Sequence, residues 1–179
     1  MRQKPGAKCI LIGLLAATLA VTCGCRPRRG TAYEGYAFVA AAGSLSLAVV
    51  DLTSFSVARQ IPLAARPAQI LSDPARQALY VMGEGGPSGL TVVDTASLAI
   101  RRTMWLAEKP LRLRLSADGG RLYTLDARGH LFKSLDPEKI SHDRQIRLAA
   151  APVDFDLSPD GRWACVSLAS GEVEIGIQF

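Results

Sequence analysis

Residues 110–126 read PLRLRLSADGGRLYTLD, and residues 152–168 read PVDFDLSPDGRWACVSL. Each stretch starts at a proline, alternates apolar with charged residues, turns at Asp-Gly and continues into a second apolar run. Pro67 starts a third copy 43 residues before Pro110, and Pro152 follows Pro110 after 42 residues. A period in the low forties that is rich in strand-forming residues is typical of β-propeller blades. The sequence therefore predicts an all-β protein.

Two further spacings surround the three prolines. Thirteen residues after each proline stands an aromatic residue or a cysteine, at Tyr80, Tyr123 and Cys165. Sixteen residues before each stands an aspartate, at Asp51, Asp94 and Asp136. These aspartates close a strand just before a turn, where a carboxylate can accept hydrogen bonds from the following backbone amides. We expect them to be structural acids and not catalytic ones.

The linking turns of the last two units have a chemical signature of their own. Asp118-Gly119 and Asp160-Gly161 predict tight hairpin turns, because Asp accepts local backbone bonds and Gly adopts positive φ without strain. The Gly-rich segment 83–89 is expected to be a hairpin loop, since no helix follows it to make a phosphate cradle.

The repeats lie near residues 35–66, 67–109, 110–151 and 152–179, about three and a half four-stranded blades. In this division the first unit lacks its innermost strand, and the fourth ends before its outermost one. A closed propeller needs four to eight blades. Three interpretations are open: a truncated product, a ring completed by self-association or by another chain through open blade edges, or a small four-bladed ring.

Residues 1–25 are interpreted as a signal peptide and residues 26–34 as a linker. Basic residues precede an uncharged apolar run, residues 9–22, that is too short to span a bilayer. The run ends in Thr22-Cys23-Gly24-Cys25, which resembles the lipobox of bacterial lipoproteins. The resemblance implies lipidation at Cys25, or at Cys23, and a place at the outer membrane or the periplasmic face of the envelope. The alternative is an ordinary secretory signal that is cut nearby.

The charge balance and the cysteines limit the function further. After Cys25 the chain has 18 basic and 16 acidic residues, so most of the overall charge of +5 belongs to the first 25 residues. The nearly balanced remainder does not predict a nucleic-acid-binding surface. Cys165 is the one cysteine beyond this leader, and its apolar surroundings predict a buried small hydrophobic residue.

Several of these motifs resemble the YVTN family of β-propeller repeats. They are Ser158-Pro159-Asp160-Gly161-Arg162, Leu79-Tyr80-Val81 and Val92-Val93-Asp94-Thr95. The family includes YncE-like and lactonase-like seven-bladed propellers, so the resemblance implies WD40-like blades over about residues 33–179. The turn Asp73-Pro74-Ala75-Arg76 and the cysteine at position 165 depart from the family pattern.

The strand after each proline would line the central channel. Its polar positions carry Arg112 and Arg114 in one unit and Asp154 and Asp156 in the next. Strict alternation gives such a strand one dry and one polar face. One interpretation is that Arg112 pairs with Asp154, and Arg114 with Asp156, across the blade junction. Others are a polar channel mouth for an anionic or sugar-like ligand, and plain solvent exposure.

Signatures of catalysis are few. His130 and His142 have no second ligand at metal spacing, and no nucleophile motif occurs, so we expect no metal and no cofactor. We expect no nucleic-acid partner either. The sequence favours an exported, lipid-anchored module that binds or scaffolds an unknown protein or glycan at the cell envelope. The alternatives are a lactonase-like propeller enzyme that uses the channel residues, and the propeller of a redox enzyme.

Overall fold

The computed structural model describes residues 34–41, 43–84, 89–107, 110–139 and 141–175. They belong to one compact unit of the chain, Glu34–Phe179. The interpreted signal peptide, with Cys23 and Cys25, lies outside the described residues. No helix within those ranges is both long and apolar enough for a membrane span.

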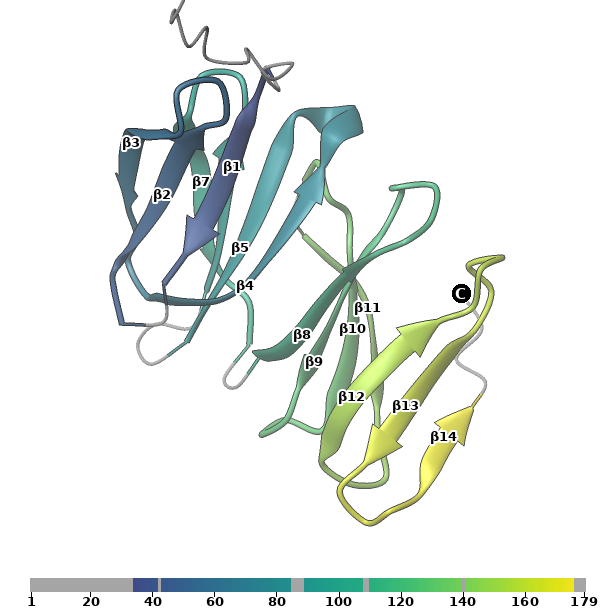
Figure 1. Ribbon diagram of the computed structural model, residues 1–179. Helices are drawn as coiled ribbons and strands as arrows, with labels where there is room; N and C mark the ends of the chain where they lie inside the picture. The colour runs from purple at the N-terminus through teal and green to yellow at the C-terminus, as the bar shows by residue number, and fades with distance from the viewer. Residues whose placement is uncertain (1–33, 42, 85–88, 108–109, 140, 176–179) are drawn as a thin grey trace, which may run out of the picture. The chain divides into compact units, whose positions relative to one another are not determined.

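The described residues form four antiparallel sheets, coloured from purple to yellow in Figure 1. Sheet 1 contains β1 (Tyr36–Ala40), β2 (Ser46–Asp51) and β3 (Ser56–Pro62). Sheet 2 contains β4 (Arg66–Asp73), β5 (Ala78–Glu84), β6 (Gly89–Asp94) and β7 (Ala99–Trp105). Sheet 3 contains β8 (Pro110–Leu115), β9 (Leu122–Asp126), β10 (Leu131–Leu135) and β11 (His142–Arg147). Sheet 4 contains β12 (Pro152–Leu157), β13 (Ala164–Leu168) and β14 (Val173–Ile175).

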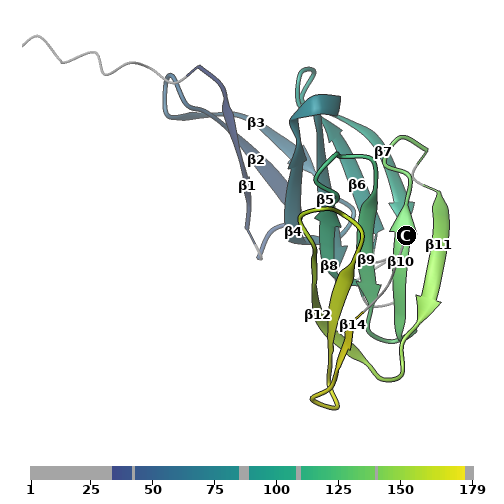
Figure 2. The same cartoon turned by 90° about the vertical axis from the view of Figure 1, so that its right-hand side faces the viewer.

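Each sheet is a meander in which every strand pairs with the next one along the chain. In sheets 2 and 3 the first strands, β4 and β8, lie toward one side and the last strands, β7 and β11, toward the other (Figure 2). The first strands of neighbouring sheets touch, since β8 contacts both β4 and β12. This arrangement of four-stranded meanders is that of propeller blades.

The aspartates that end β2, β6 and β10 or follow them directly hold the next turn in place. Asp51 accepts bonds from the amides of Thr53 and Ser54, and Asp94 from those of Ala96 and Ser97. Asp136 accepts from the amides of Glu138 and Lys139. Backbone donors lower the pKa of all three carboxyls, as expected for a charge that accepts hydrogen bonds.

The two Asp-Gly turns form as the sequence predicts. The Ser116 hydroxyl donates to Asp118, and the Ser158 hydroxyl donates to Asp160. Gly119 has φ +71° and Gly161 has φ +69°, the left-handed region that favours glycine. The corresponding turn of sheet 2 departs from this pattern, because Pro74–Arg76 makes a single 3₁₀ turn.

The hydrophobic core consists of three layers, each between two consecutive sheets. Sheets 1 and 2 bury Leu47, Val49, Ile61, Leu63, Leu79, Val81 and Val93. Sheets 2 and 3 bury a layer that includes Tyr80, Met82, Leu90, Leu106, Leu113 and Leu122. Sheets 3 and 4 bury Tyr123, Leu125, Phe132, Phe155, Val166 and Leu168 among others. The central strands of sheets 2 and 3, which are β5, β6, β9 and β10, are therefore buried on both faces, whereas β7 is mostly exposed.

Two expectations about single positions are wrong. Cys165 is exposed, because its neighbours Ala164 and Val166 take the buried face of β13 and the alternation turns Cys165 outward. Gly83 is not in a loop but in β5, where an added Cβ would lie 2.7 Å from the Ala65 Cβ. The close approach of the neighbouring segment explains a glycine inside a strand.

A buried ion pair lies between sheets 2 and 3. The Lys133 Nζ is 3.5 Å from Asp126 Oδ2, and the two side chains are 5% and 3% exposed. The same ammonium group lies 5.2 Å from the ring centroid of Trp105, which belongs to sheet 2. A buried charge that loses its partner is strongly destabilising.

Replacing Lys133→Ala is therefore expected to lower the free energy of unfolding by about 3 kcal/mol, because it breaks a buried ion pair, while the amides of Arg128 and Gly129 still donate to Asp126. Urea denaturation of the full chain measures the change. Lys139→Ala is the matched control, since Lys139 pairs with Asp136 at 3.7 Å but is 78% exposed, and it should leave the midpoint nearly unchanged. Equal midpoints for the two variants would contradict the expectation.

Candidate functional site

The four charged residues predicted for the first strands meet in pairs between β8 and β12. Arg112 Nε lies 3.2 Å from Asp154 Oδ1, and Arg114 Nε lies 3.4 Å from Asp156 Oδ1. Arg114 also donates to the backbone carbonyl of Phe155 at 2.9 Å, and its guanidinium lies over the Phe155 ring. The cross-junction pairing interpretation thus describes their geometry.

Both aspartates are held further by their own strand. Asp154 accepts from the amide of Phe155, and Asp156 accepts from the amide of Leu157. All four side chains keep at least 40% of their surface exposed, so each pair contributes at most about 1 kcal/mol to stability. The pairs align sheet 3 with sheet 4, and their solvent-facing sides remain accessible.

At the equivalent position of sheet 2, an uncharged side chain links the first strands of two neighbouring sheets. Gln69 donates to the carbonyl of Leu113 at 2.8 Å and accepts from the Leu113 amide at 2.9 Å. A polar side chain at this repeat position therefore links the first strands at two successive junctions. This recurrence indicates a positioning role for Gln69, Arg112 and Asp154.

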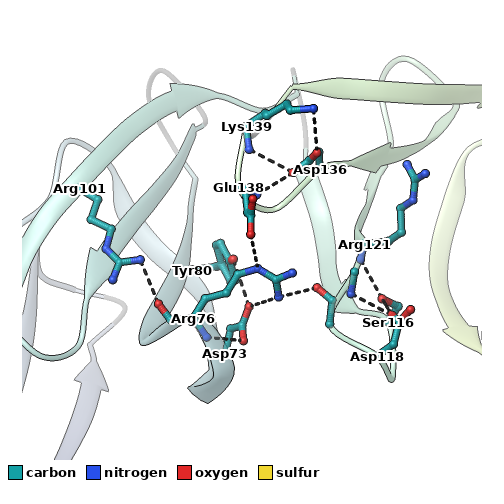
Figure 3. Close-up of polar contacts among 12 residues, drawn as sticks. Asp73, Arg76, Tyr80, Arg101, Ser116, Asp118, Arg121, Asp136, Glu138 and Lys139 are labelled. Atoms are coloured by element: carbon teal, nitrogen blue, oxygen red, sulfur yellow. Dashed lines mark hydrogen bonds and ion pairs between the residues drawn. The ribbon is translucent and has the colours of Figure 1, made fainter.

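A second polar cluster lies between sheets 2 and 3 and centres on Arg76 (Figure 3). Its Nη1 donates to Asp73 Oδ2 at 3.1 Å and to the carbonyl of Gly119 at 2.7 Å. Its Nε lies 3.8 Å from Glu138 Oε1. Arg76 thus connects its own sheet with both the β8–β9 turn and the β10–β11 turn of sheet 3. The hydrogen bond to Asp73 raises the pKa of Arg76.

Two acids belong to the same cluster. Asp73 is 1% exposed and Tyr80 is fully buried, and the Tyr80 hydroxyl donates to Asp73 at 3.4 Å. Burial, and after it the charge of Asp73, raises the pKa of Tyr80 to about 12. The buried Asp73 carboxylate thus accepts hydrogen bonds from an arginine and from a neutral phenol, and this arrangement serves the stability of the fold.

Sequence reasoning missed Arg76 and the pair Lys133–Asp126. Arg76 lies in a turn that departs from the Asp-Gly pattern, and only this departure could have indicated from the sequence that Arg76 has a special role. Lys133 lies at a strand position that predicts burial, where a charge needs a partner, but the sequence does not identify that partner.

The two histidines lie apart in the topology, with His130 in the β9–β10 turn and His142 at the first residue of β11. Among the described residues, no three His, Cys, Asp or Glu side chains are grouped as a metal would require.

Comparison with known proteins supports the fold. No protein-family model matches the sequence, and no curated protein matches it. The hydrazine synthase of Kuenenia stuttgartiensis superposes with a TM-score of 0.66 at 20% identity, over 79% of this chain and 46% of the other. The dihydro-heme d1 dehydrogenase NirN, solved with DHE, superposes with a TM-score of 0.64 at 15% identity, over 79% of this chain and 35% of the other.

Both neighbours are β-propeller proteins, and the four sheets described here form a β-propeller segment. The chain spans less than half the length of either neighbour. At these identities the likeness concerns the fold.

The pKa of Tyr80 predicts a loss of stability in alkali. Above its ordinary pKa near 10, the phenol ionises in the unfolded chain but stays neutral in the folded one up to about 12. Its contribution to stability is complete below pH 10 and is lost as the pH rises through 12. The urea midpoint of the unmodified protein should therefore fall between about pH 9.5 and 11.5, a window set by the ordinary and the folded-state pKa of Tyr80. In Tyr80→Phe this fall should be smaller. Tyr36→Phe, at a tyrosine that is 46% exposed, is the control, and an equal reduction in both variants would contradict this assignment.

Proposed function

We propose that this protein is an exported, lipid-anchored β-propeller repeat protein of the YVTN type. It acts as a non-catalytic binding or scaffolding module for a protein or glycan, at the outer membrane or the periplasmic face of the cell envelope. The observation that carries the proposal is the use of the first-strand charges. Arg112, Arg114, Asp154 and Asp156 are engaged with one another and with backbone groups, as structural residues would be.

The repeat motifs support the YVTN assignment at the level of geometry. The Asp-Gly turns, the capping aspartates and the buried tyrosines at positions 80 and 123 occupy equivalent places in successive sheets. Such a scaffold presents turns of variable sequence on a constant frame, and binding residues are often found on loops of this kind.

A second candidate is the propeller part of a redox enzyme, and one structural neighbour favours it, because its name describes a dehydrogenase. A lactonase-like activity, with Asp154 and Asp156 as acid and base, is the other enzymatic alternative. In that case the ion pairs with Arg112 and Arg114 would have to open, since both carboxylates are engaged.

Self-association is a further part of the proposal. The outer face of sheet 1 is apolar, with Val39 opposite Ala48 and Val50 opposite Val57 in the strand register. Val39 is 49% exposed and Val57 is 58% exposed. An apolar sheet face of this kind can pack on another blade, either from a second copy or from another chain.

The anchor is tested by replacing each candidate cysteine. Cys25→Ser is expected to abolish incorporation of a clickable fatty acid in bacterial cells and to move the protein out of the detergent phase in Triton X-114 partition. A single acyl chain binds membranes only weakly. Stable partition into the detergent phase therefore indicates that the protein carries the complete lipid modification. Cys23→Ser is the matched control and should keep both signals; the reverse result assigns the lipid to Cys23, and labelling of both variants contradicts the anchor.

The role is tested on the full chain extracted from membranes in mild detergent. We expect light scattering with mass spectrometry to find a complex with one stoichiometric envelope partner, without lactone hydrolysis and without haem absorption. Lactone hydrolysis that is lost in Asp154→Asn, or a haem spectrum that copurifies with the chain, would overturn the non-catalytic proposal. A discrete dimer that dissociates in Val57→Lys would instead identify the partner as a second copy of the chain.

A further inference from the structure

The edge strands β7 and β11 lie on the same side of the molecule and are open to solvent (Figure 2). β7 is exposed along most of its length, whereas β5 and β6 before it are almost wholly buried. Residues 144–147 of β11 are exposed as well. Four exposed residues of these two strands, here called the β7–β11 surface, are Arg102, Trp105, Gln145 and Arg147.

The central residue of the β7–β11 surface is Trp105, which is 54% exposed. Its ring centroid lies 5.2 Å from the Nζ of Lys133, and that ammonium group is fixed by its buried ion pair with Asp126. The ammonium group occupies one face of the ring, so the exposed part of the side chain includes the opposite face. A large aromatic side chain that is held in place and yet exposed is typical of a binding surface.

The strand register brings two polar side chains close to Trp105. Lys133 of β10 pairs with Gln145 of β11, and Leu131 pairs with Arg147. Paired residues lie on the same face of a sheet, and diagonal neighbours remain within reach of long side chains. Because Trp105 lies over Lys133, the Gln145 amide is beside the ring and the Arg147 guanidinium is one diagonal step away.

This edge of sheet 3 carries a surplus of positive charge. Residues 127–135 and residues 144–153 contain no aspartate and no glutamate. Their cationic residues are Arg128, Lys133, Arg144 and Arg147. The two segments lie side by side because β10 pairs with β11. Lys133 is paired with the buried Asp126, so the surplus belongs to the arginines, and a local surplus of one sign attracts ligands of the other.

Arg102 adds a second cation to the β7–β11 surface. It is exposed, and its Nη1 donates to the backbone carbonyl of Lys139 at 2.7 Å. A guanidinium group has five N–H donors, so this bond to a neutral oxygen leaves its charge and most of its donors available. Arg102 also borders a cavity of about 380 Å³ between sheets 2 and 3, which lies in the range of small-molecule sites. Arg76 and Arg101 line the same cavity but are bonded to acids of sheet 2.

The three kinds of side chain in this surface match one class of ligand. An exposed indole face accepts the apolar C–H face of a sugar ring, and an amide can both donate to and accept from hydroxyl groups. Arginine binds a planar carboxylate with two parallel bonds. A lipid surface would instead require a broad apolar face, whereas Trp105 is the one large apolar residue of the β7–β11 surface.

We propose that the β7–β11 surface binds an acidic glycan, a sugar chain whose rings carry carboxylates. One sugar ring lies on Trp105, its hydroxyl groups lie toward Gln145, and carboxylates lie toward Arg147 and Arg102. The inference rests on the proposed function, because it specifies the glycan that the envelope module would bind. It uses neither the first-strand ion pairs nor the lipid anchor.

Isothermal titration of the full chain with tetragalacturonate tests the proposal, in a detergent that has no sugar head group. Maltotetraose is the neutral ligand for comparison. Trp105→Phe keeps an aromatic ring over Lys133, and Arg147→Gln removes the charge but keeps a polar side chain. The matched controls are Trp163→Phe and Arg162→Gln, since these exposed residues are of the same types and belong to sheet 4.

Tetragalacturonate is expected to bind with a Kd of about 1 mM or lower and to bind more tightly than maltotetraose. Trp105→Phe and Arg147→Gln should each weaken binding by about fivefold or more, and the two controls should stay within about twofold. The chain has two tryptophans, so the fluorescence change on binding should persist in Trp163→Phe and disappear in Trp105→Phe. Thermal unfolding of each variant establishes that it is folded.

The proposal is overturned if tetragalacturonate does not bind at about 10 mM, if maltotetraose binds equally well, or if the controls weaken binding as much as the two variants. It is also overturned if Arg147→Gln lowers binding to phosphatidylglycerol vesicles but not to tetragalacturonate, which would identify a lipid surface. Glycan binding by a chain that carries no lipid supports this inference and contradicts the anchored module. A stoichiometric protein partner without glycan binding does the reverse.

Discussion

The packing of one sheet face against the next is the constraint on which the structure depends. The central strands of sheets 2 and 3 are buried on both faces, and the three apolar layers contain nearly all of the large buried side chains among the described residues. No single meander of three or four strands has a core of its own, since an isolated small sheet is marginally stable in water. Each blade is therefore stable because of its neighbours, as in other repeat architectures.

The apolar layers do not fix the relative position of two sheets, and polar groups at the junctions do so. Gln69 bridges the backbone of β4 to that of β8, and the pairs of Arg112 and Arg114 bridge β8 to β12. Arg76 connects sheet 2 to two turns of sheet 3, and it keeps the buried Asp73 satisfied. These contacts are directional, so they can select one alignment among the many that hydrophobic contact alone would permit.

The sequence predicted the fold and the turn residues well, because both depend on local patterns. The period of 42 to 43 residues, the alternation in β8 and β12 and the Asp-Gly turns are properties of short segments. The prediction was wrong for Cys165, where the apolar context hid the fact that the alternation of β13 turns this residue outward. It was also wrong for Gly83, which lies inside β5. The close approach of Ala65 leaves no room for a side chain there, and a local sequence pattern cannot reveal this contact.

The sequence by itself determined the repeat and the strand-and-turn pattern of each blade, and it offered the pairing of the first-strand charges as one of three interpretations. These follow from spacing and from the preferences of residues for strands and turns. Only the tertiary structure decided which polar residues share a junction: Lys133 with Asp126 and Trp105, Arg76 with Gly119, and Ser134 with Arg144 in the wall of a cavity. The physical reason is that such contacts join residues of different strands or different sheets, so their partners depend on register and on how the sheets stack.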